Sequence, residues 1–499
     1  MQVCTGLARA IAKIRPDPNT TWLTGRWIPA PLTDPLWLLR HRPQLRITSG
    51  SNQSKNVANL PGRTCDILTP EVTIVSDARL RQRGAPIAVT LAVVTFSGIL
   101  ADIVSLSQVL TLSGANSLLI LYPLGGLGVA IPGMALGPVV DRWARLPMLR
   151  TVGLGIAGAY LIALALLPSA PMAAVSLAWI VAVLQNTLFP MLLWSLAADI
   201  FNVSESREIN GWIGSWSYVG RLAALALSTL APALAHWAQV PLTALLVIPP
   251  ALTAAVAIWL PRRMRDAPAA RGTAGATDSL ANGWRFVKEV RIWRWLVIGA
   301  AFSCTADGLN SIGVAAASES VFGQNPATLQ TYLAGMQLLA TLLSLAVQRW
   351  VSAPAIRRIG VRGGLLVQPV SQVAAGVLLT ASLLTGDLLV LAIAIVVWRV
   401  PAWTLDQTAK SAALGYVPDQ RRARVSLILV LASIALAWIL SAPLAAPALL
   451  NGPAWLLGAT SAIVASIAFV WWRKLYRGWD TGLLDWRLQR RKRPGFTGL

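Results

Sequence analysis

The stretch NSLLILYPLGGLGVAIPGMALGPVVDRWARLPMLR, residues 116–150, decides the fold class of this chain. Its first part, residues 116–139, is an apolar run. Because a membrane-spanning helix needs about 20 apolar residues, this run is long enough to cross a bilayer. The run is followed by Asp141, Arg142 and Arg145, and then by a second apolar run. This order predicts two membrane helices joined by a short basic loop at the membrane surface.

The rest of the chain repeats this pattern. Of its 499 residues, 55% are hydrophobic and only 12% are charged, whereas a soluble domain carries about 25% charged residues. We therefore predict an all-α polytopic membrane protein with about twelve transmembrane helices. The predicted spans are 87–110, 116–139, 147–168, 172–198, 212–234, 241–260, 293–315, 327–350, 363–384, 387–410, 425–447 and 453–472.

Basic residues occur in alternate loops, and the formal net charge is +22. The opposite loops, near 113–116, 169–171, 236–241, 319–326, 385–386 and 451–453, contain no Lys or Arg. Because Lys and Arg are retained in the cytoplasm during insertion, both termini are expected there, in a multi-pass protein of the cytoplasmic (inner) membrane. The positive charge then indicates topology and contact with anionic membrane lipid, not nucleic acid.

The sequence divides into five predicted regions. Residues 1–84 are polar and basic and are expected to form a disordered cytoplasmic extension. Residues 85–260 and 292–475 are expected to form an N-terminal and a C-terminal six-helix bundle, joined by a cytoplasmic linker at 261–291 with one amphipathic piece near 284–290. Residues 476–499 are expected to form a basic cytoplasmic tail.

The two predicted bundles resemble each other at a spacing of about 205–216 residues. Asp102 in the first span corresponds to Asp307 in the seventh, and Gln185 in the fourth corresponds to Arg399 in the tenth. Repeated halves are a common plan among transporters, which bind substrate where the halves meet.

The loop after the second span contains the motif GPVVDRWAR, residues 137–145. It resembles the signature of the major facilitator superfamily in the same loop. Ala144 stands where that family has its second glycine, and Leu146 where it usually has a basic residue. The resemblance implies two six-helix bundles and a gating loop formed by Gly137, Asp141, Arg142 and Arg145. The other interpretation is a basic turn that only fixes topology.

A weaker resemblance points to a narrower group. Residues 194–201, WSLAADIF, and the stretch from 408 to 422 are similar to the ATP:ADP antiporter family and its bacterial relatives. Nucleotide carriers are expected to hold several cations in their cavity, and the candidates here are Arg399 and Lys410. A nucleotide-type exchanger is therefore an alternative function.

Polar residues near the middle of the spans are the candidate site. A charge at the bilayer centre costs about 2.5–3.5 kcal/mol, so it must face the bundle interior or find a partner. The predicted substrate- or ion-binding cavity contains Asp102, Gln185, Asn186, Asp307, Asn310 and Arg399. In one hypothesis an Asp exchanges a proton or cation while Arg399 holds an anionic group. In the other, Asp307 and Arg399 form a structural ion pair.

Three further predictions concern charges and prolines near the helix ends. Asp406 and Lys410, four residues apart, are expected to pair on one helix face. Pro190 and Pro401 are expected to bend their helices. Four charges in matching cytoplasmic turns are expected to form either a charge network that holds the outward-open state or a set of solvated loop charges: Glu205, Arg207, Asp419 and Arg421.

These observations favour a secondary active transporter that moves a small solute by alternating access, coupled to a proton or another ion. A non-transporting receptor or assembly factor on the same fold is an alternative. An enzyme is not expected, because the sequence has no HExxH or GxSxG motif and no His in a span. We expect a small-molecule substrate, a proton or cation as coupling ion, lipid contact, no cofactor, no metal site, no nucleic acid and a monomer.

Overall fold

The computed structural model describes residues 72–140, 143–201, 203–264, 280–323, 325–414, 416–417 and 419–492. Within these ranges all regular elements are helices, which confirms the predicted all-α class. The first elements in chain order are α2 (Val72–Ser113), η2 (Ala115–Ser117), α3 (Leu118–Val140), α4 (Arg145–Leu166), α5 (Pro171–Ile200), α6 (Val203–Ala238), η3 (Leu242–Val247), α7 (Ile248–Arg263) and α8 (Leu280–Glu289). The later elements are α9 (Arg291–Phe322), α10 (Pro326–Trp350), α11 (Ser352–Thr385), α12 (Leu388–Pro401), η4 (Ala402–Asp406), α13 (Gln407–Leu414), α14 (Asp419–Leu450) and α15 (Leu456–Lys492).

The chain is a multi-pass membrane protein. In the described part, 11 helical segments are long and apolar enough to cross a membrane. Helix α9 is not among these segments, and it carries Asp307, Asn310 and Glu319. It packs against α11, α14 and α15, so protein surrounds much of its surface. With α9 as the seventh span, the helices follow the order of the twelve predicted spans.

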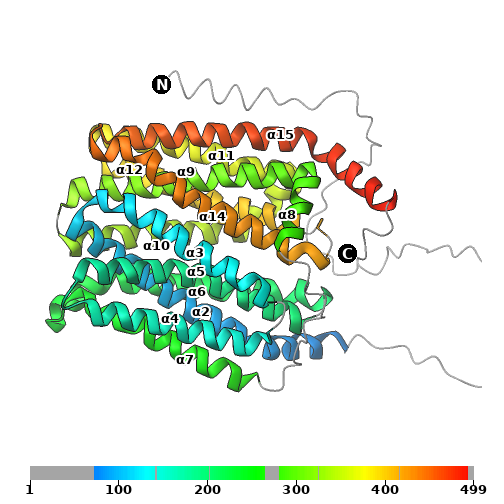
Figure 1. Cartoon of the computed structure of the whole chain (residues 1–499), viewed down its shortest axis with the longest axis horizontal. Helices are drawn as coiled ribbons and strands as arrows, with labels where there is room; N and C mark the ends of the chain where they lie inside the picture. Colours follow the sequence, from blue (N-terminus) through cyan, green and yellow to red (C-terminus); the bar gives the residue numbers. More distant parts are fainter. Residues whose placement is uncertain are drawn as a thin grey trace, which may run out of the picture. The chain divides into compact units, whose positions relative to one another are not determined.

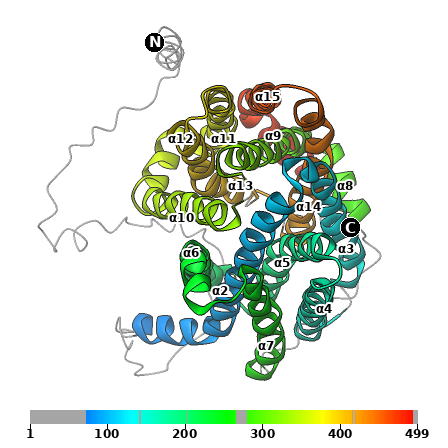
Figure 2. The same ribbon diagram turned by 90° about the vertical axis from the view of Figure 1, so that its left-hand side faces the viewer.

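The helices form two sets, shown side by side in Figure 1. We call α2–α7 the N-terminal half and α9–α15 the C-terminal half. Helix α2 packs on α5, α6 and α7, and α9 packs on α11, α14 and α15. The halves meet chiefly where α3 packs on α14 and where α6 packs on α10, as the view along the helices shows (Figure 2).

Several predicted region boundaries fall inside helices. Helix α2 begins at Val72, so the predicted boundary at residue 84 lies within it, and residues 1–71 are outside the described part. The amphipathic piece of the predicted linker lies in α8, whose Phe286 and Val287 are buried in a cluster with Trp293 and Val425. Residues 265–279 are outside the described part. Helix α15 continues through most of the predicted tail to Lys492.

The two prolines expected to bend helices behave differently. Helix α5 continues through Pro190. After Pro401, by contrast, the chain forms the π-helical turn η4 before α13 begins. Proline has no N–H to donate, and its ring displaces the carbonyl of the preceding turn, so the regular hydrogen bonding is interrupted. The hydroxyl of Thr404 donates to the Val400 carbonyl at 2.7 Å and satisfies one acceptor there.

Candidate functional site

Four charged side chains from both halves lie in one region near the middle of the spans. These are Asp102 of α2, Arg221 of α6, Asp307 of α9 and Arg399 of α12, and we call them the central charge cluster. Asp102 is within electrostatic range of both Arg399 and Arg221. The structure thus brings together the three charges that the sequence singled out, Asp102, Asp307 and Arg399, and adds Arg221.

Asp307 and Arg399 form the C-terminal side of the cluster. The indole Nε1 of Trp398 donates to Oδ1 of Asp307 at 2.6 Å, and Nη1 of Arg399 lies 3.8 Å from Oδ2 of Asp307. Nη2 of Arg399 also donates to Ser311 Oγ at 3.4 Å. The two charged side chains keep 31% and 20% of their surface exposed, so there is room beside them for water or a solute.

Arg221 forms the N-terminal side with Asp102, and the sequence analysis did not identify it. Its guanidinium lies 4.5 Å from the centroid of the Trp403 ring, and that of Arg399 lies 5.3 Å from the same centroid. The hydroxyl of Tyr218 donates to the Trp403 carbonyl at 3.3 Å. The signal that could have found Arg221 was present, because it is an ionisable residue inside an apolar span.

An aromatic cluster lies beside Asp102 and joins the halves. It consists of Tyr122 of α3, Trp179 of α5 and Trp438 of α14, whose ring centroids are 5.1–5.5 Å apart. The Trp179 indole approaches the Asp102 carboxyl, but its Nε1 has no hydrogen-bond partner among the described residues. The Tyr122 hydroxyl lies beside Ser311, next to Asp307. Aromatic rings therefore connect the two acids of the cluster.

Two glycines permit the helix contacts that position these charges. Gly220, next to Arg221, packs so closely on α2 that a Cβ there would overlap the carbonyl group of Ala92. Gly308, next to Asp307, packs on α14, where a Cβ would lie 2.9 Å from Ser441 Oγ. Any larger side chain at either position must push a charge-bearing helix away from its neighbour.

The described contacts of the predicted amide residues lie within one half. Gln185 is fully buried, and its Nε2 donates to the Val94 carbonyl at 2.9 Å and to Ser97 Oγ. The Ser461 hydroxyl donates to Asn310 Oδ1 at 2.8 Å, which links α15 to α9. Asn186 is partly buried against Gly98 of α2. Gln185 and Asn310 thus connect helices inside their own halves.

Asp406 and Lys410 form a second charge pair, at 2.7 Å, inside the C-terminal half. Lys410 Nζ also donates to Gln368 Oε1 of α11 at 3.1 Å. The Asp406 side chain is only 4% exposed and that of Lys410 17%. The expected pairing four residues apart is present, in a buried setting between α11 and α13.

We call the helix ends near Arg145, Arg263 and Arg357 the basic end. Here the described ion pairs lie within one half. Arg145 Nε lies 3.0 Å from Asp199 Oδ2, and Arg83 Nη1 lies 3.0 Å from Glu205 Oε1. In the C-terminal half Arg362 pairs with Asp480. Sequence analysis did not identify Arg83, Asp199 or Asp480 as partners.

The other residues predicted at the basic end are only partly described. Of the predicted gating loop, Gly137 lies in the last turn of α3, and Asp141 and Arg142 are outside the described residues. Arg207 is part of helix α6, and Asp419 and Arg421 are part of helix α14. Arg145 and Glu205 have the partners given above, Asp199 and Arg83, which both belong to the N-terminal half.

At the opposite, non-basic end, hydrogen bonds do link the halves. The Ala115 amide donates to Glu319 Oε2 at 2.6 Å. Gln330 of α10 accepts from the Ser107 hydroxyl of α2 at 3.3 Å and donates to the Ser228 carbonyl of α6 at 3.1 Å. The described structure is thus fastened between the halves at its non-basic end.

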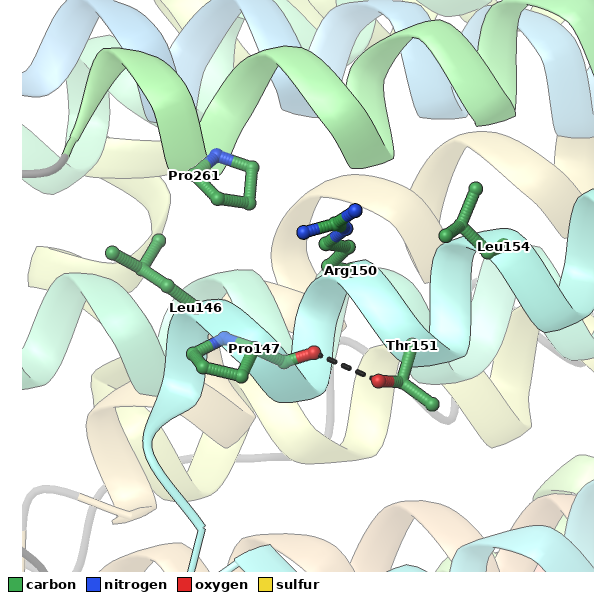
Figure 3. Close-up of a pocket in the computed structure, with 6 residues that line it drawn as sticks. All are labelled: Leu146, Pro147, Arg150, Thr151, Leu154 and Pro261. Atoms are coloured by element: carbon green, nitrogen blue, oxygen red, sulfur yellow. Dashed lines mark hydrogen bonds between the residues drawn. The ribbon is translucent and has the colours of Figure 1, made fainter.

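A surface groove of about 450 Å³ lies between α4 and α7, away from the central charge cluster. Figure 3 shows Arg150 of α4 facing Pro261 of α7 across it. No group of three or more His, Cys, Asp or Glu side chains able to hold a metal ion occurs among the described residues. The cluster itself is therefore the candidate site.

Solved structures with the same arrangement of helices are membrane transporters. No family model and no curated protein matches the chain by sequence. The nucleoside transporter NupG superposes with a TM-score of 0.55 at 14% identity, over 79% of this chain and 98% of that one. The POT family transporter PepTSo gives 0.57 at 12% identity, over 79% and 98%. A bacterial homologue of the iron transporter ferroportin, in an inward-facing state, gives 0.56 at 14%, over 80% and 99%.

Proposed function

Because the chain has the major facilitator fold, we propose that it is a secondary active transporter that moves a small solute across the cytoplasmic membrane by alternating access. The observation that carries this proposal is the convergence of Asp102 and Arg221 from one half on Asp307 and Arg399 from the other. Charges buried in membrane helices are costly and mark solute or ion pathways. A site built from both halves changes its access when the halves rock against each other.

The positions of the contacts between the halves support one state of that cycle. The halves are hydrogen-bonded at the non-basic end through Glu319 and Gln330, and the described ion pairs at the basic end lie within each half. If the basic end faces the cytoplasm, as the distribution of Lys and Arg favours, these hydrogen bonds hold the halves together on the outer side of the membrane. Both termini are then cytoplasmic.

We assign the cluster residues separate roles. Arg221 and Arg399 hold an anionic group of the solute, because a guanidinium forms paired hydrogen bonds with planar anions. Asp102 or Asp307 takes up the coupling proton or cation. Asp102 faces Tyr122 of α3, Tyr160 of α4, Arg221 of α6 and Arg399 of α12, so its charge state depends on groups from both halves.

The same charges disfavour a nucleotide-type exchanger. The cluster holds two cations and two carboxylates, and Lys410 is already paired with Asp406 at 2.7 Å. A di- or triphosphate would therefore meet as many acids as bases in this region. Repulsion between like charges in a poorly solvated site opposes such a ligand.

Transport into proteoliposomes tests the proposal with a mixture of candidate solutes. Vesicles with wild-type protein would face an isotope-labelled metabolite extract under a proton gradient, and mass spectrometry would identify the solutes that accumulate. We expect at least one solute to accumulate, and an uncoupler to abolish its accumulation. Arg399→Gln should remove it, and Arg358→Gln, an exposed arginine at the basic end, should retain it.

Two results would contradict the proposal. Equal solute entry into wild-type and protein-free vesicles would favour a receptor or assembly factor on the same fold. Unchanged uncoupler-sensitive accumulation in both Asp102→Asn and Asp307→Asn would remove the coupling role from the cluster.

A further inference from the structure

Arg221 is the least neutralised charge of the cluster. Among the described residues no carboxylate lies within ion-pair distance of it, and its strongest charged neighbour is the cation Arg399. Both acids are placed closer to Arg399, Asp307 at 3.8 Å and Asp102 with Arg399 as its strongest charged neighbour. Arg221 lies about 18 Å along α6 from Ile209, deep in the span. A partly buried guanidinium in this position calls for an anion from elsewhere.

The indole of Trp403 does not supply that anion. Arg221 and Arg399 both approach its ring, at 4.5 and 5.3 Å from the centroid. A cation–π contact favours each guanidinium but leaves its charge in place. Two cations beside one ring repel each other, and a bound anion between them would relieve that repulsion.

The charge count sets the valence of the anion. Asp102 and Asp307 offset Arg221 and Arg399 in number, so the cluster is formally neutral when all four are charged. A single negative charge that enters with one proton keeps the site neutral. A carboxylate also matches the fork of a guanidinium, with which it forms two parallel hydrogen bonds.

The aromatic cluster beside Asp102 favours a solute with a planar, unsaturated ring. Tyr122, Trp179 and Trp438 stack beside Asp102 with centroids 5.1–5.5 Å apart. Trp179 is only 2% exposed, and its indole approaches the Asp102 carboxyl, so the aromatic cluster lies directly beside the charges of the site.

We propose that the solute is an aromatic monocarboxylate, whose carboxylate pairs with Arg221 and whose ring lies against Tyr122, Trp179 and Trp438. The proposal rests on the transporter function proposed above, because it names the solute class of that same site. It uses the Arg221 guanidinium, which has no carboxylate at ion-pair distance among the described residues, and the aromatic rings beside Asp102.

Binding to the purified full-length protein in detergent tests this inference independently of transport. Calorimetric titrations would use phenylacetate, its neutral amide phenylacetamide, the zwitterion phenylalanine, the saturated acid cyclohexylacetate and inorganic phosphate. We expect phenylacetate to bind, and phenylacetamide to bind roughly 10- to 100-fold more weakly, because a charged hydrogen-bonded pair is lost. Cyclohexylacetate should bind several-fold more weakly than phenylacetate, because ring stacking is lost.

Substitutions test whether the carboxylate of the solute binds at Arg221. Arg221→Gln should reduce phenylacetate affinity by roughly 10- to 100-fold and bring it close to that of phenylacetamide, whereas Arg358→Gln should leave it unchanged. The comparison between acid and amide on the wild-type protein remains decisive if Arg221→Gln does not fold. No phenylacetate binding, equal binding of acid and amide, or tighter binding of phenylalanine or phosphate would overturn the proposal. If phenylacetate binds at Arg221 but no solute crosses the proteoliposome membrane, the site inference holds and the transport function fails.

Discussion

The two halves of the molecule treat their buried charges differently. In the C-terminal half, Asp307 accepts from Trp398 and faces Arg399, and Asp406 pairs with Lys410. In the N-terminal half, Asp102 and Arg221 have no ion pair at bonding distance among the described residues. A charge that already has a partner stabilises the protein, whereas one without a partner is available to a ligand. The C-terminal half thus anchors the site, and the N-terminal half is left to respond to solute.

The largest expected effect is on the buried pair of the C-terminal half. Lys410→Met should lower the free energy of unfolding by about 3–5 kcal/mol, because it leaves the carboxylate of Asp406 buried without its cation. Unfolding of the detergent-solubilised protein, followed by tryptophan fluorescence, would measure this. Lys474→Met, at an exposed lysine of α15, is the matched control and should change stability little. A similar small change in Lys410→Met would mean that the C-terminal charges do not anchor the half.

A smaller effect separates two indoles with opposite hydrogen bonding. Trp398→Phe should cost about 1–3 kcal/mol, because Asp307 Oδ1 loses the N–H that reaches it at 2.6 Å. Trp179→Phe removes an N–H without a partner in the described structure, so the cost should be limited to lost packing. The same unfolding measurement compares the two variants. Equal losses would show that the difference in hydrogen bonding has no energetic weight.

The contact between the halves at the non-basic end is expected to contribute about 1 kcal/mol to the free energy that keeps this end closed. Glu319→Gln weakens the bond from the Ala115 amide because the acceptor loses its charge. The population open at this end should rise roughly fivefold, since about 1 kcal/mol corresponds to that ratio. Electron–electron distances between spin labels on exposed Ser169 and Thr385, in a cysteine-free background, would report it. An unchanged distance distribution would show that Glu319 does not hold the end closed.

The smallest expected effect on stability is at Arg221. Arg221→Gln should lower the free energy of unfolding by no more than about 0.5–1 kcal/mol, because the guanidinium has no ion pair to lose among the described residues and gives up only its contact with the Trp403 ring. Arg399→Gln should cost more, because it leaves Asp307 without its cation. If Arg221→Gln were as damaging as Arg399→Gln, the N-terminal charge would be structural and the contrast between the halves would fail.

Much of the fold was predictable because lipid imposes simple constraints. The apolar runs predicted the helices, and the spacing from Asp102 to Asp307 indicated two related halves. Helix α9, a predicted span that is not among the 11 apolar segments of the described part, carries Asp307, Asn310 and Glu319. Neighbouring helices surround much of it, so these polar side chains need not face lipid.

The site was less predictable, because position in a span does not give direction around a helix. Asp102, Asp307 and Arg399 lie together, whereas Gln185, equally central in its span, bonds to Val94 and Ser97 inside its own half. Arg221 was overlooked although its span was predicted. The aromatic cluster forms only where α3, α5 and α14 pack together, and no local sequence pattern predicts that packing.

Trp403 is held to α6 in two ways at once. Its carbonyl accepts from the Tyr218 hydroxyl, and its ring contacts the guanidinium of Arg221 one helical turn further along. Relative sliding of α6 and η4 has to break or rearrange both contacts, one hydrogen bond and one contact between a cation and a ring. A single residue of η4 therefore resists displacement of the two halves at this junction.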